Sequence, residues 1–247
     1  MIAATSGTAA LLVATSRPPS LAASPARLTL NGAESRTIRV TNSGGGAALV
    51  DVAPAGFALD LRGRPRIVRR TDAAALRLEV QPRRLALQPG EATTLTVSAV
   101  PPPHVRAGDH PALVLLTTQP RGAGLDVRMQ IGIVVIVRMP GAVLHRLELR
   151  GLRVRRGRGA DLLELSVVNR GDVTEHLARE RIRVSLRRRG RVIARMRAGP
   201  RDVFPRSPAT ETFRYRGRLR GPATALVEVV RPANGVPILR RTFRIRL

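Results

Sequence analysis

The sequence predicts an all-β protein that folds into two tandem β-sandwich domains. Three observations predict it: short segments of alternating apolar and polar residues recur along the chain, turns rich in proline and glycine separate them, and no window shows the apolar period of a helix. The 247 residues are 43% hydrophobic but only 2% aromatic. The length therefore suits two domains, whose cores must consist mainly of leucine, valine, isoleucine and alanine.

The first domain is expected over residues 27–140. Gln88-Pro89-Gly90-Glu91 has the composition of a tight turn, and the three prolines at 101–103 form a stiff connector. The predicted strands of this domain span residues 28–30, 35–42, 47–52, 76–80, 93–100, 112–117 and 125–137.

Pro140-Gly141 interrupts the pattern, and we place the second domain over residues 141–247. A short repeat links the two halves: Asn42 stands two residues before Gly44, and Asn169 two residues before Gly171, each directly after an alternating segment. Asparagine and glycine suit turns with positive φ, so we expect two related modules. The predicted strands of the second domain lie at residues 163–167, 182–186, 225–229 and 243–247.

Residues 1–26 have the character of a signal peptide or a disordered leader. Residues 9–14 form a short apolar stretch, and candidate cleavage sites follow at Ser20-Leu21-Ala22 and Ser24-Pro25-Ala26, although the first ten residues contain no arginine. We therefore expect an extracytoplasmic protein: secreted, periplasmic or on the cell surface. We predict no transmembrane helix, because the longest later apolar run covers only residues 131–137 and a helical span needs about 18.

The chain carries a net charge of +26, and all 43 basic residues are arginine because the sequence contains no lysine. Residues 1–140 hold 16 arginines and 8 acidic residues, whereas residues 141–247 hold 27 arginines and 9 acidic residues. Arginine in place of lysine is typical of genomes rich in G and C, so the basicity reflects either codon usage or a polyanionic partner. In the second case, the second domain carries the binding surface.

Two arginine series with a period of two form the candidate polyanion-binding site. They comprise Arg181, Arg183, Arg187 and Arg189, and Arg214, Arg216, Arg218 and Arg220. A period of two puts each series on one face of a sheet. Such a face either binds a polyanion, for example a cell-wall polymer or lipopolysaccharide, or is a solvated surface whose repulsion salt screens. Nucleic acid is not the expected partner, because no aromatic residues interleave and no nucleic-acid-binding motif occurs.

The run around Ile131, Ile133, Val135 and Val137 is apolar on both faces of its predicted strand. One interpretation is a central strand that is covered on both sides, at the domain junction. The other is an edge strand that pairs with a partner chain by β-augmentation.

Nothing in the sequence indicates catalysis, and we predict a non-enzymatic protein without a metal or cofactor. The absence of cysteine excludes disulfides, thiolate metal sites and cysteine nucleophiles. The four histidines do not have the spacing of metal ligands; they are His104, His110, His145 and His176. No Gly-x-Ser-x-Gly motif occurs. Arg170-Gly171-Asp172 spells an integrin-binding tripeptide, which turn composition explains equally well.

Several turn-and-strand motifs resemble those of bacterial extracytoplasmic immunoglobulin-like modules. They are residues 42–46, residues 76–82 continuing through 85–91 into 94–97, and Gly108-Asp109-His110 leading into residues 113–116. Two groups share them: the peptidoglycan-binding surface proteins that partner WxL proteins, and the periplasmic pilus-assembly chaperones. The resemblance covers residues 27–140 well and 141–247 loosely, and it implies immunoglobulin-like sandwiches. In the chaperones, a basic residue of the first strand and another of a later strand hold a subunit's C-terminal carboxylate; Arg27 is in position for the first.

Three functions stay open. The first is a cell-envelope binding or structural protein that contacts cell-wall polymer or an acidic surface or secreted protein. An alternative is a pilus-type assembly chaperone that acts by β-strand pairing. Another alternative is a basic nucleic-acid-binding protein.

Overall fold

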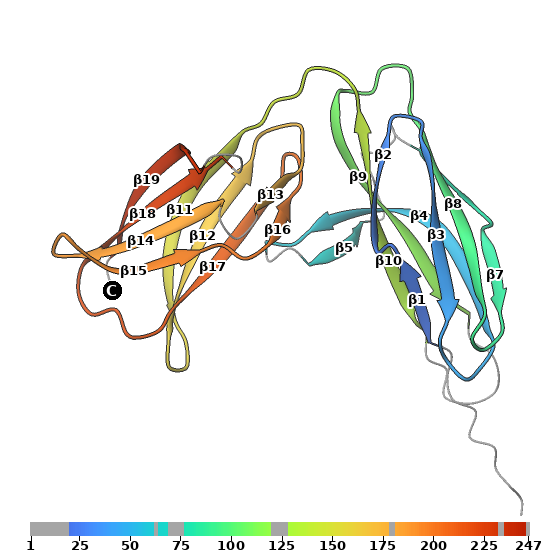
Figure 1. Cartoon of the computed structure of the whole chain (residues 1–247), viewed down its shortest axis with the longest axis horizontal. Helices are drawn as coiled ribbons and strands as arrows, with labels where there is room; N and C mark the ends of the chain where they lie inside the picture. The colour runs from blue at the N-terminus through green and yellow to red at the C-terminus, as the bar shows by residue number, and fades with distance from the viewer. Residues whose placement is uncertain are drawn as a thin grey trace, which may run out of the picture.

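The computed structural model describes residues 20–61, 64–68, 77–119, 128–177, 181–231 and 235–245. Within these ranges the chain forms strands and turns without a helix, so no helix capable of crossing a membrane occurs among them. Each sheet draws its strands from one side of the segment 140–146 only. The strands therefore build two sandwiches, one on each side of this segment (Figure 1).

The first sandwich consists of two mostly antiparallel sheets. One sheet has the spatial order β1 (Leu21–Ser24), β3 (Ser35–Asn42), β8 (Ala92–Val100) and β6 (Arg77–Gln81). The other has the order β2 (Arg27–Asn31), β10 (Gln130–Met139), β9 (Gly108–Thr118), β4 (Ala48–Leu59) and β5 (Pro65–Val68), and β7 (Arg84–Leu87) also pairs with β4.

The alternation seen in the sequence decides which side chains fill this core. In β3, Ile38 and Val40 are fully buried, whereas Thr37 and Arg39 point outward. Leu95 of β8 stands opposite Ile38, and Val97 is buried on the same side, since residues of equal parity in a strand share a face. The prediction of strand 35–42 is confirmed, and strand β10 begins at Gln130, with residues 125–127 outside the described ranges.

The expected leader reaches too far along the chain. Residues 21–24, assigned to the leader 1–26, form strand β1, which pairs with β3 from Leu21 opposite Asn42 to Ser24 opposite Arg39. Leu21 is buried in the core of the first sandwich. Cleavage after Ala26 would remove this strand. The remainder of the proposed leader, residues 1–19, lies outside the described residues.

The second sandwich places a three-stranded sheet against a four-stranded one. The first has the order β11 (Leu147–Arg156), β12 (Asp161–Asn169) and β17 (Pro208–Tyr215); the second has the order β15 (Arg191–Arg197), β14 (Ile182–Arg188), β18 (Ala223–Val230) and β19 (Pro237–Ile245). A short pair, β13 (Glu175–Leu177) and β16 (Arg201–Val203), completes it. Alternate residues such as Leu163, Leu165, Val184 and Val227 form the core.

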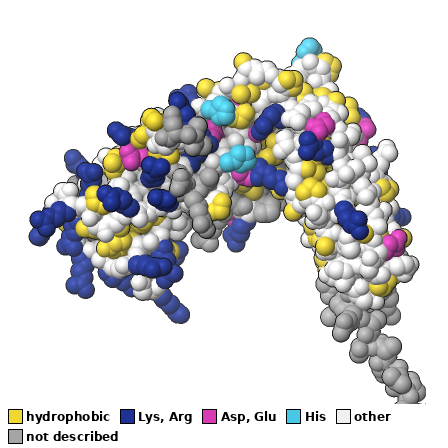
Figure 2. Space-filling model, in the orientation of Figure 1, with side chains coloured by type: hydrophobic (Ala, Val, Ile, Leu, Met, Phe, Trp, Pro, Cys, Tyr) yellow, Lys and Arg dark blue, Asp and Glu magenta, His cyan; other side chains and the backbone are white. Residues whose placement is uncertain are grey.

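The two sandwiches form an arch with the linker at its top (Figure 1). The hairpin of β4 and β5 reaches under the arch, and the backbone N–H of Thr210 in β17 donates to the carbonyl of Leu61 beyond β4 (2.7 Å). Basic side chains gather on the second sandwich (Figure 2), which agrees with the uneven distribution of arginine along the chain.

Candidate functional site

The junction of the two sandwiches has an apolar centre. Phe204, which follows β16 in the second sandwich, packs with Leu113 of β9 and Ile136 of β10, and all three side chains are buried. Val134 and Leu59 pack against this cluster from the same face of the first sandwich. The junction therefore explains why β10 is apolar on both faces: one face fills the core, and the other meets the second sandwich.

A polar network joins the sandwiches beside this apolar centre. The carboxylate of Asp109, at the start of β9, is fully buried and accepts hydrogen bonds from Arg138 Nε (2.8 Å) and from the backbone N–H of Thr174 in the second sandwich (2.8 Å). The backbone N–H of Asp109 donates to the carbonyl of Asp172 (2.7 Å). Burial alone would raise the pKa of Asp109, but the hydrogen bonds from Arg138 and Thr174 hold it below its usual value.

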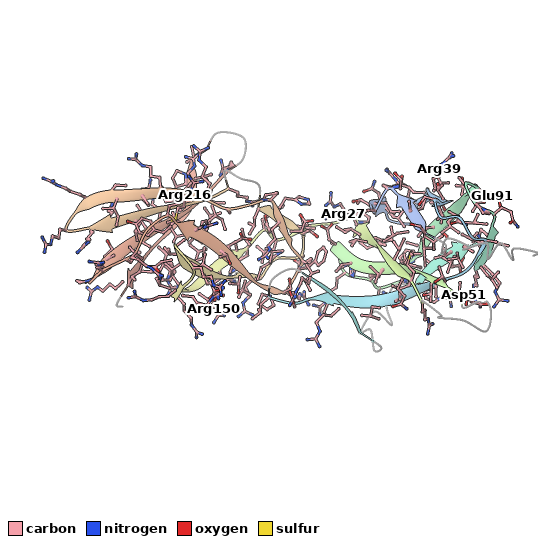
Figure 3. All side chains as sticks on the ribbon, turned by 90° about the horizontal axis from the view of Figure 1, so that it is seen from below. Arg27, Arg39, Asp51, Glu91, Arg150 and Arg216 are labelled. Atoms are coloured by element: carbon pink, nitrogen blue, oxygen red, sulfur yellow. The ribbon has the colours of Figure 1, made fainter. Side chains whose placement is uncertain are left out.

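Arg27 lies on the side of the first sandwich that faces the second (Figure 3). It stands opposite Val134 in the parallel β2–β10 pair, so it shares a sheet face with Val134 and Arg138. Its side chain is 36% exposed and forms an ion pair with Asp202 of β16, whose carboxylate also contacts His176 Nδ1. Burial lowers the pKa of Arg27 and, together with the neighbouring arginines, that of His176. The guanidinium of Arg27 is therefore a carboxylate-binding site, and the carboxylate of Asp202 already occupies it.

A second polar group lines a cavity of about 440 Å³ behind the linker. Glu175 is buried and accepts from Arg181 Nη2 (2.5 Å), and its other oxygen lies 3.0 Å from Nδ1 of His145. Arg138 lines the same cavity from the first sandwich, together with Gly141 of the linker. The junction therefore contains two clusters of charged side chains, around Asp202 and around Glu175, beside its apolar centre.

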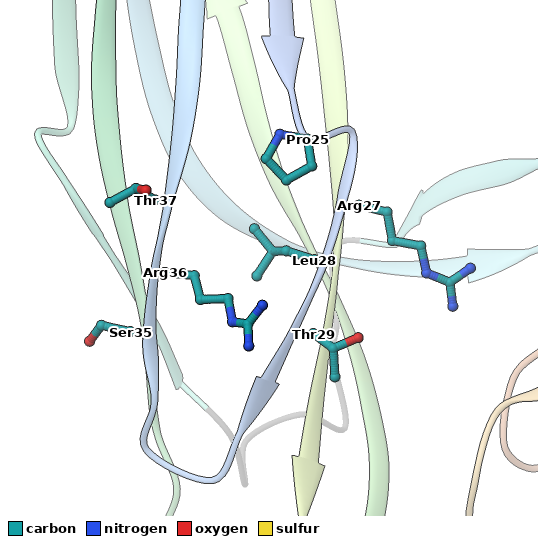
Figure 4. Close-up of a pocket in the computed structure, with 7 residues that line it drawn as sticks. All are labelled: Pro25, Arg27, Leu28, Thr29, Ser35, Arg36 and Thr37. Carbon is teal, nitrogen blue, oxygen red and sulfur yellow. The ribbon is translucent and has the colours of Figure 1, made fainter.

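A groove of about 710 Å³ opens at the side of the first sandwich, between β2 and β3. It exists because the chain changes sheet near Pro25: β1 pairs with β3 only as far as Arg39, and β2 then pairs with β10 in the opposite sheet. Leu28 and Arg36 point into the groove, whereas Arg27 points away from it toward the second sandwich (Figure 4).

The same change of sheet leaves half of β10 with an open edge. β9 pairs with β10 along all of Gln130–Met139, but β2 pairs with it only from Val134 to Arg138. Among the described residues, no strand pairs with the other edge of residues 130–133.

Of the two interpretations of residues 131–137, the edge strand is therefore wrong for Val135 and Val137, which lie between two paired strands. Ile133, Val135 and Val137 point into the core, and Ile131 packs against it, so these side chains are not presented to a partner. The open edge therefore consists of main-chain groups that no described strand pairs with, and it is confined to residues 130–133, the segment that carries Ile131 and Ile133.

The two predicted arginine series do not form two continuous ladders. Arg183 and Arg187 do lie on the outer face of β14, but Arg181 precedes the strand and pairs with buried Glu175, and Arg189 stands in the turn after it. β17 ends at Tyr215, so of the second series only Arg214 lies on a strand. Arg216, Arg218 and Arg220 follow the strand at exposed positions, and Arg218 pairs with Asp161 (3.2 Å).

The series also belong to different sheets, since β14 and β17 lie on opposite sides of the second core. Together with Arg183 and Arg187, the outer face of the β14 sheet instead presents Arg195 and Arg197 of β15, which belong to neither predicted series.

The junction residues carried weak or misleading signals in the sequence. Arg170-Gly171-Asp172 is a junction turn, in which Arg170 pairs with Glu148 (3.2 Å) and Asp172 contacts the first sandwich, so an adhesive role is not favoured. No pattern in the sequence marks Asp202 or Phe204, because neither repeats with a period. Two of the histidines, His145 and His176, contact carboxylates of the junction.

Comparisons with known proteins support the fold. No protein-family model and no curated protein matches the sequence. Solved structures do match: a chain from a chaperone–tip adhesin complex of CFA/I fimbriae biogenesis (TM-score 0.51, 8% identity, 92% of this chain and 100% of that one) and the class 5 fimbriae chaperone CfaA (TM-score 0.50, 9% identity, 92% and 100%). The predicted all-β fold of two immunoglobulin-like sandwiches is confirmed. These matches are fimbrial chaperones, and they lend no support to the resemblance to partners of WxL proteins.

Proposed function

We propose that the protein is an extracytoplasmic, non-enzymatic assembly chaperone that holds a secreted subunit by β-strand pairing. The observation that carries this proposal is the open main-chain edge of residues 130–133 in β10. An extended segment of a partner that lacks a strand of its own could continue the sheet there, since main-chain hydrogen bonds supply affinity in such pairing. The likeness in fold to two fimbrial chaperone structures adds to this proposal.

Arg27 supplies a second point of attachment in this proposal. Arg27 is a half-exposed guanidinium on the sheet that carries the open edge, and a carboxylate, that of Asp202, is bound to it. The C-terminal carboxylate of a subunit is chemically equivalent to the carboxylate of Asp202 and would displace it from Arg27. The resemblance to pilus chaperones implies that a basic residue of the first strand holds such a C-terminal carboxylate. Arg138 is the basic residue of a later strand on the same face, although Asp109 holds its guanidinium at two oxygens (2.8 and 3.2 Å).

Site-specific crosslinking tests the proposal. A photo-reactive amino acid replaces Gln130 on the open edge or, as a matched control, Glu79 on β6, which is the edge strand of the other sheet. After expression in cells that export the chain together with the secreted proteins of its source, we expect crosslinks from position 130 to a β-rich secreted protein and none from position 79. Equal crosslinking from both positions, or none from 130, contradicts strand pairing at β10.

Arg27→Ala tests the carboxylate site separately. We expect the captured subunit to bind about tenfold more weakly, the loss of one charge-assisted contact, whereas Arg39→Ala on the outer face of β3 leaves binding unchanged. Equal effects of the two substitutions would show that Arg27 contributes only charge.

A further inference from the structure

The hairpin of β14 and β15 concentrates basic charge on the second sandwich, and its turn lies at the end of that sandwich far from the linker (Figure 1). Ile182, Val184 and Leu186 of β14 are buried, which turns the residues between them outward. The register places Arg183 opposite Arg197 and Ser185 opposite Arg195, so these side chains share the outer face. We call this element the arginine hairpin; its arginines are Arg183, Arg187, Arg188, Arg189, Arg191, Arg195 and Arg197.

Several features of the arginine hairpin oppose folding. Two cross-strand pairs, Arg183 with Arg197 and Arg188 with Arg191, bring like charges directly opposite each other, which is destabilising. Arg189 has a φ of 47°, a conformation that glycine, asparagine or aspartate adopts at lower cost. Codon usage explains arginine in place of lysine. It does not explain why residues 187–197 contain six arginines and no acidic residue.

Little in the described part of the chain neutralises this charge. The only acidic residue opposite β14 on the neighbouring strand is Glu228, and it already pairs with Arg240 (2.8 Å). Among the described residues, no carboxylate forms an ion pair with the hairpin arginines Arg187, Arg188, Arg189, Arg191 or Arg195. Dark-blue side chains accordingly protrude from this end of the molecule (Figure 2).

Exposed apolar side chains lie among these arginines. Val192 and Ile193 are each 39% exposed; Val192 stands opposite Arg187, and Ile193 falls at the irregularity in the β14–β15 register. β15 is the edge strand of its sheet, so this apolar pair lies at a rim. A soluble polyanion gains nothing from exposed valine and isoleucine. A membrane surface accommodates both kinds of side chain, because guanidinium groups bind headgroup phosphates while apolar groups enter the interfacial layer.

We propose that the arginine hairpin docks the protein on a membrane surface whose lipid headgroups carry phosphate and net negative charge. The arginines bind the phosphates, and Val192 and Ile193 enter the interface. Because the turn of the hairpin, flanked by Arg188 and Arg191, lies at the end of the second sandwich far from the linker, docking by this end leaves β10 and Arg27 accessible (Figure 1). The proposal does not depend on the chaperone function, since it involves neither site.

Co-sedimentation of the full chain with vesicles tests this proposal. The chain is expected to sediment with vesicles of phosphatidylcholine and phosphatidylglycerol in equal parts at low salt, and not with pure phosphatidylcholine. Replacing Arg187, Arg188, Arg191 and Arg195 by serine should weaken binding by a factor on the order of one hundred or more, since each arginine near an anionic surface contributes about fivefold. Circular dichroism checks that each variant is folded.

The matched control removes the same charge elsewhere: Arg153, Arg214, Arg216 and Arg220, all exposed and outside the hairpin, are replaced by serine. We expect it to retain most of the binding. Equal loss in both variants would mean that only net charge acts, and no sedimentation of the unaltered chain with anionic vesicles would overturn the proposal outright.

The double substitution Val192→Ser and Ile193→Ser separates lipid from other phosphate. It should weaken vesicle binding about tenfold and leave binding to inorganic polyphosphate unchanged, because only the membrane interface rewards apolar insertion. Unchanged vesicle binding by this variant would assign the hairpin to a soluble polyanion and reject the membrane.

Discussion

Removing the carboxylate of Asp109 should weaken the junction more than its single ion pair suggests. In Asp109→Ala, Arg138 regains water because its side chain is 49% exposed, but the buried N–H of Thr174 loses its only acceptor among the described residues. Hydrogen bonds to charged groups contribute about 1.5–3 kcal/mol, and an orphaned buried donor costs about 1–3 kcal/mol. We therefore expect a loss of about 2–4 kcal/mol in the free energy of unfolding.

Urea unfolding followed by circular dichroism measures this loss, and Asp51→Ala is the matched control. Asp51 also pairs with an arginine, Arg84 (3.0 Å), but its side chain is 41% exposed whereas that of Asp109 is fully buried. The exposed pair should contribute at most about 1 kcal/mol. Equal losses for the two variants would refute the reasoning that burial at the junction gives Asp109 its weight.

The pH dependence of the same site has a definite sign. The folded-state pKa of Asp109 lies below its usual value, because hydrogen bonds from Arg138 and Thr174 outweigh the opposing effect of burial. Its contribution to stability is therefore present above about pH 4 and is lost as the pH falls through the lowered pKa. The difference in stability between the unaltered chain and Asp109→Asn should shrink below about pH 4 and stay constant above it.

Three further substitutions probe the junction and the second core. Phe204→Ala empties the apolar centre of the junction and should cost about 3 kcal/mol, with a larger radius of gyration in X-ray scattering; an unchanged radius would contradict a role in fixing the arch. Gly171→Ala would place Cβ 2.2 Å from the carbonyl oxygen of Leu144 and should lower the melting temperature, whereas Gly199→Ala, which meets open space, should not. Burial raises the pKa of Glu211, so stability should rise as the pH falls through that raised pKa toward the usual value of a glutamate. Glu211→Gln should remove this rise, and a rise that persists would assign it to another group.

Local alternation predicted the strands whose two faces differ, because burial on one face and solvent on the other act on every second residue. Strand 35–42 is such a case, with Ile38 and Val40 inside and Arg39 outside. The four-residue strands β1 and β5 are too short to show a period, and β1 was assigned to the leader instead. The arginine series failed where turns interrupt the strands, at Gly190 and Gly217, both of which have positive φ (78° and 151°). A period of two carries its meaning only as far as the strand continues.

The junction was beyond local reasoning for a different physical reason. The sequence around Val135 is equally consistent with an edge strand and with a strand covered on both faces, because both need apolar residues of either parity. What decides is where residues distant in sequence lie: β2 covers one half of β10, and Phe204 covers its outer face. The open edge at residues 130–133 likewise results from the end of β2, which no pattern within β10 records.

The repeat around Asn42 and Asn169 shows how one local motif serves both modules. The expected positive-φ turn is wrong, since neither Gly44 nor Gly171 has positive φ. Each asparagine is instead fully buried and holds its own loop: Asn42 Nδ2 donates to Gly46 O (2.8 Å), and Asn169 Nδ2 donates to Val173 O (2.7 Å).

In the second sandwich, the loop that Asn169 holds also provides the carbonyl of Asp172 and the N–H of Thr174 that bind Asp109. Asn169→Ala should therefore cost about 3 kcal/mol, as several buried hydrogen bonds are lost, and also loosen the arch. Asn42→Ala should cost a similar amount without enlarging the radius of gyration in X-ray scattering, because Asn42 holds a loop within the first sandwich, through Gly46, Leu87 and Gln88. If both variants left the radius unchanged, the loop would not be what fixes the arch, and the apolar centre at Phe204 together with contacts such as Arg27–Asp202 would have to hold the two sandwiches in place.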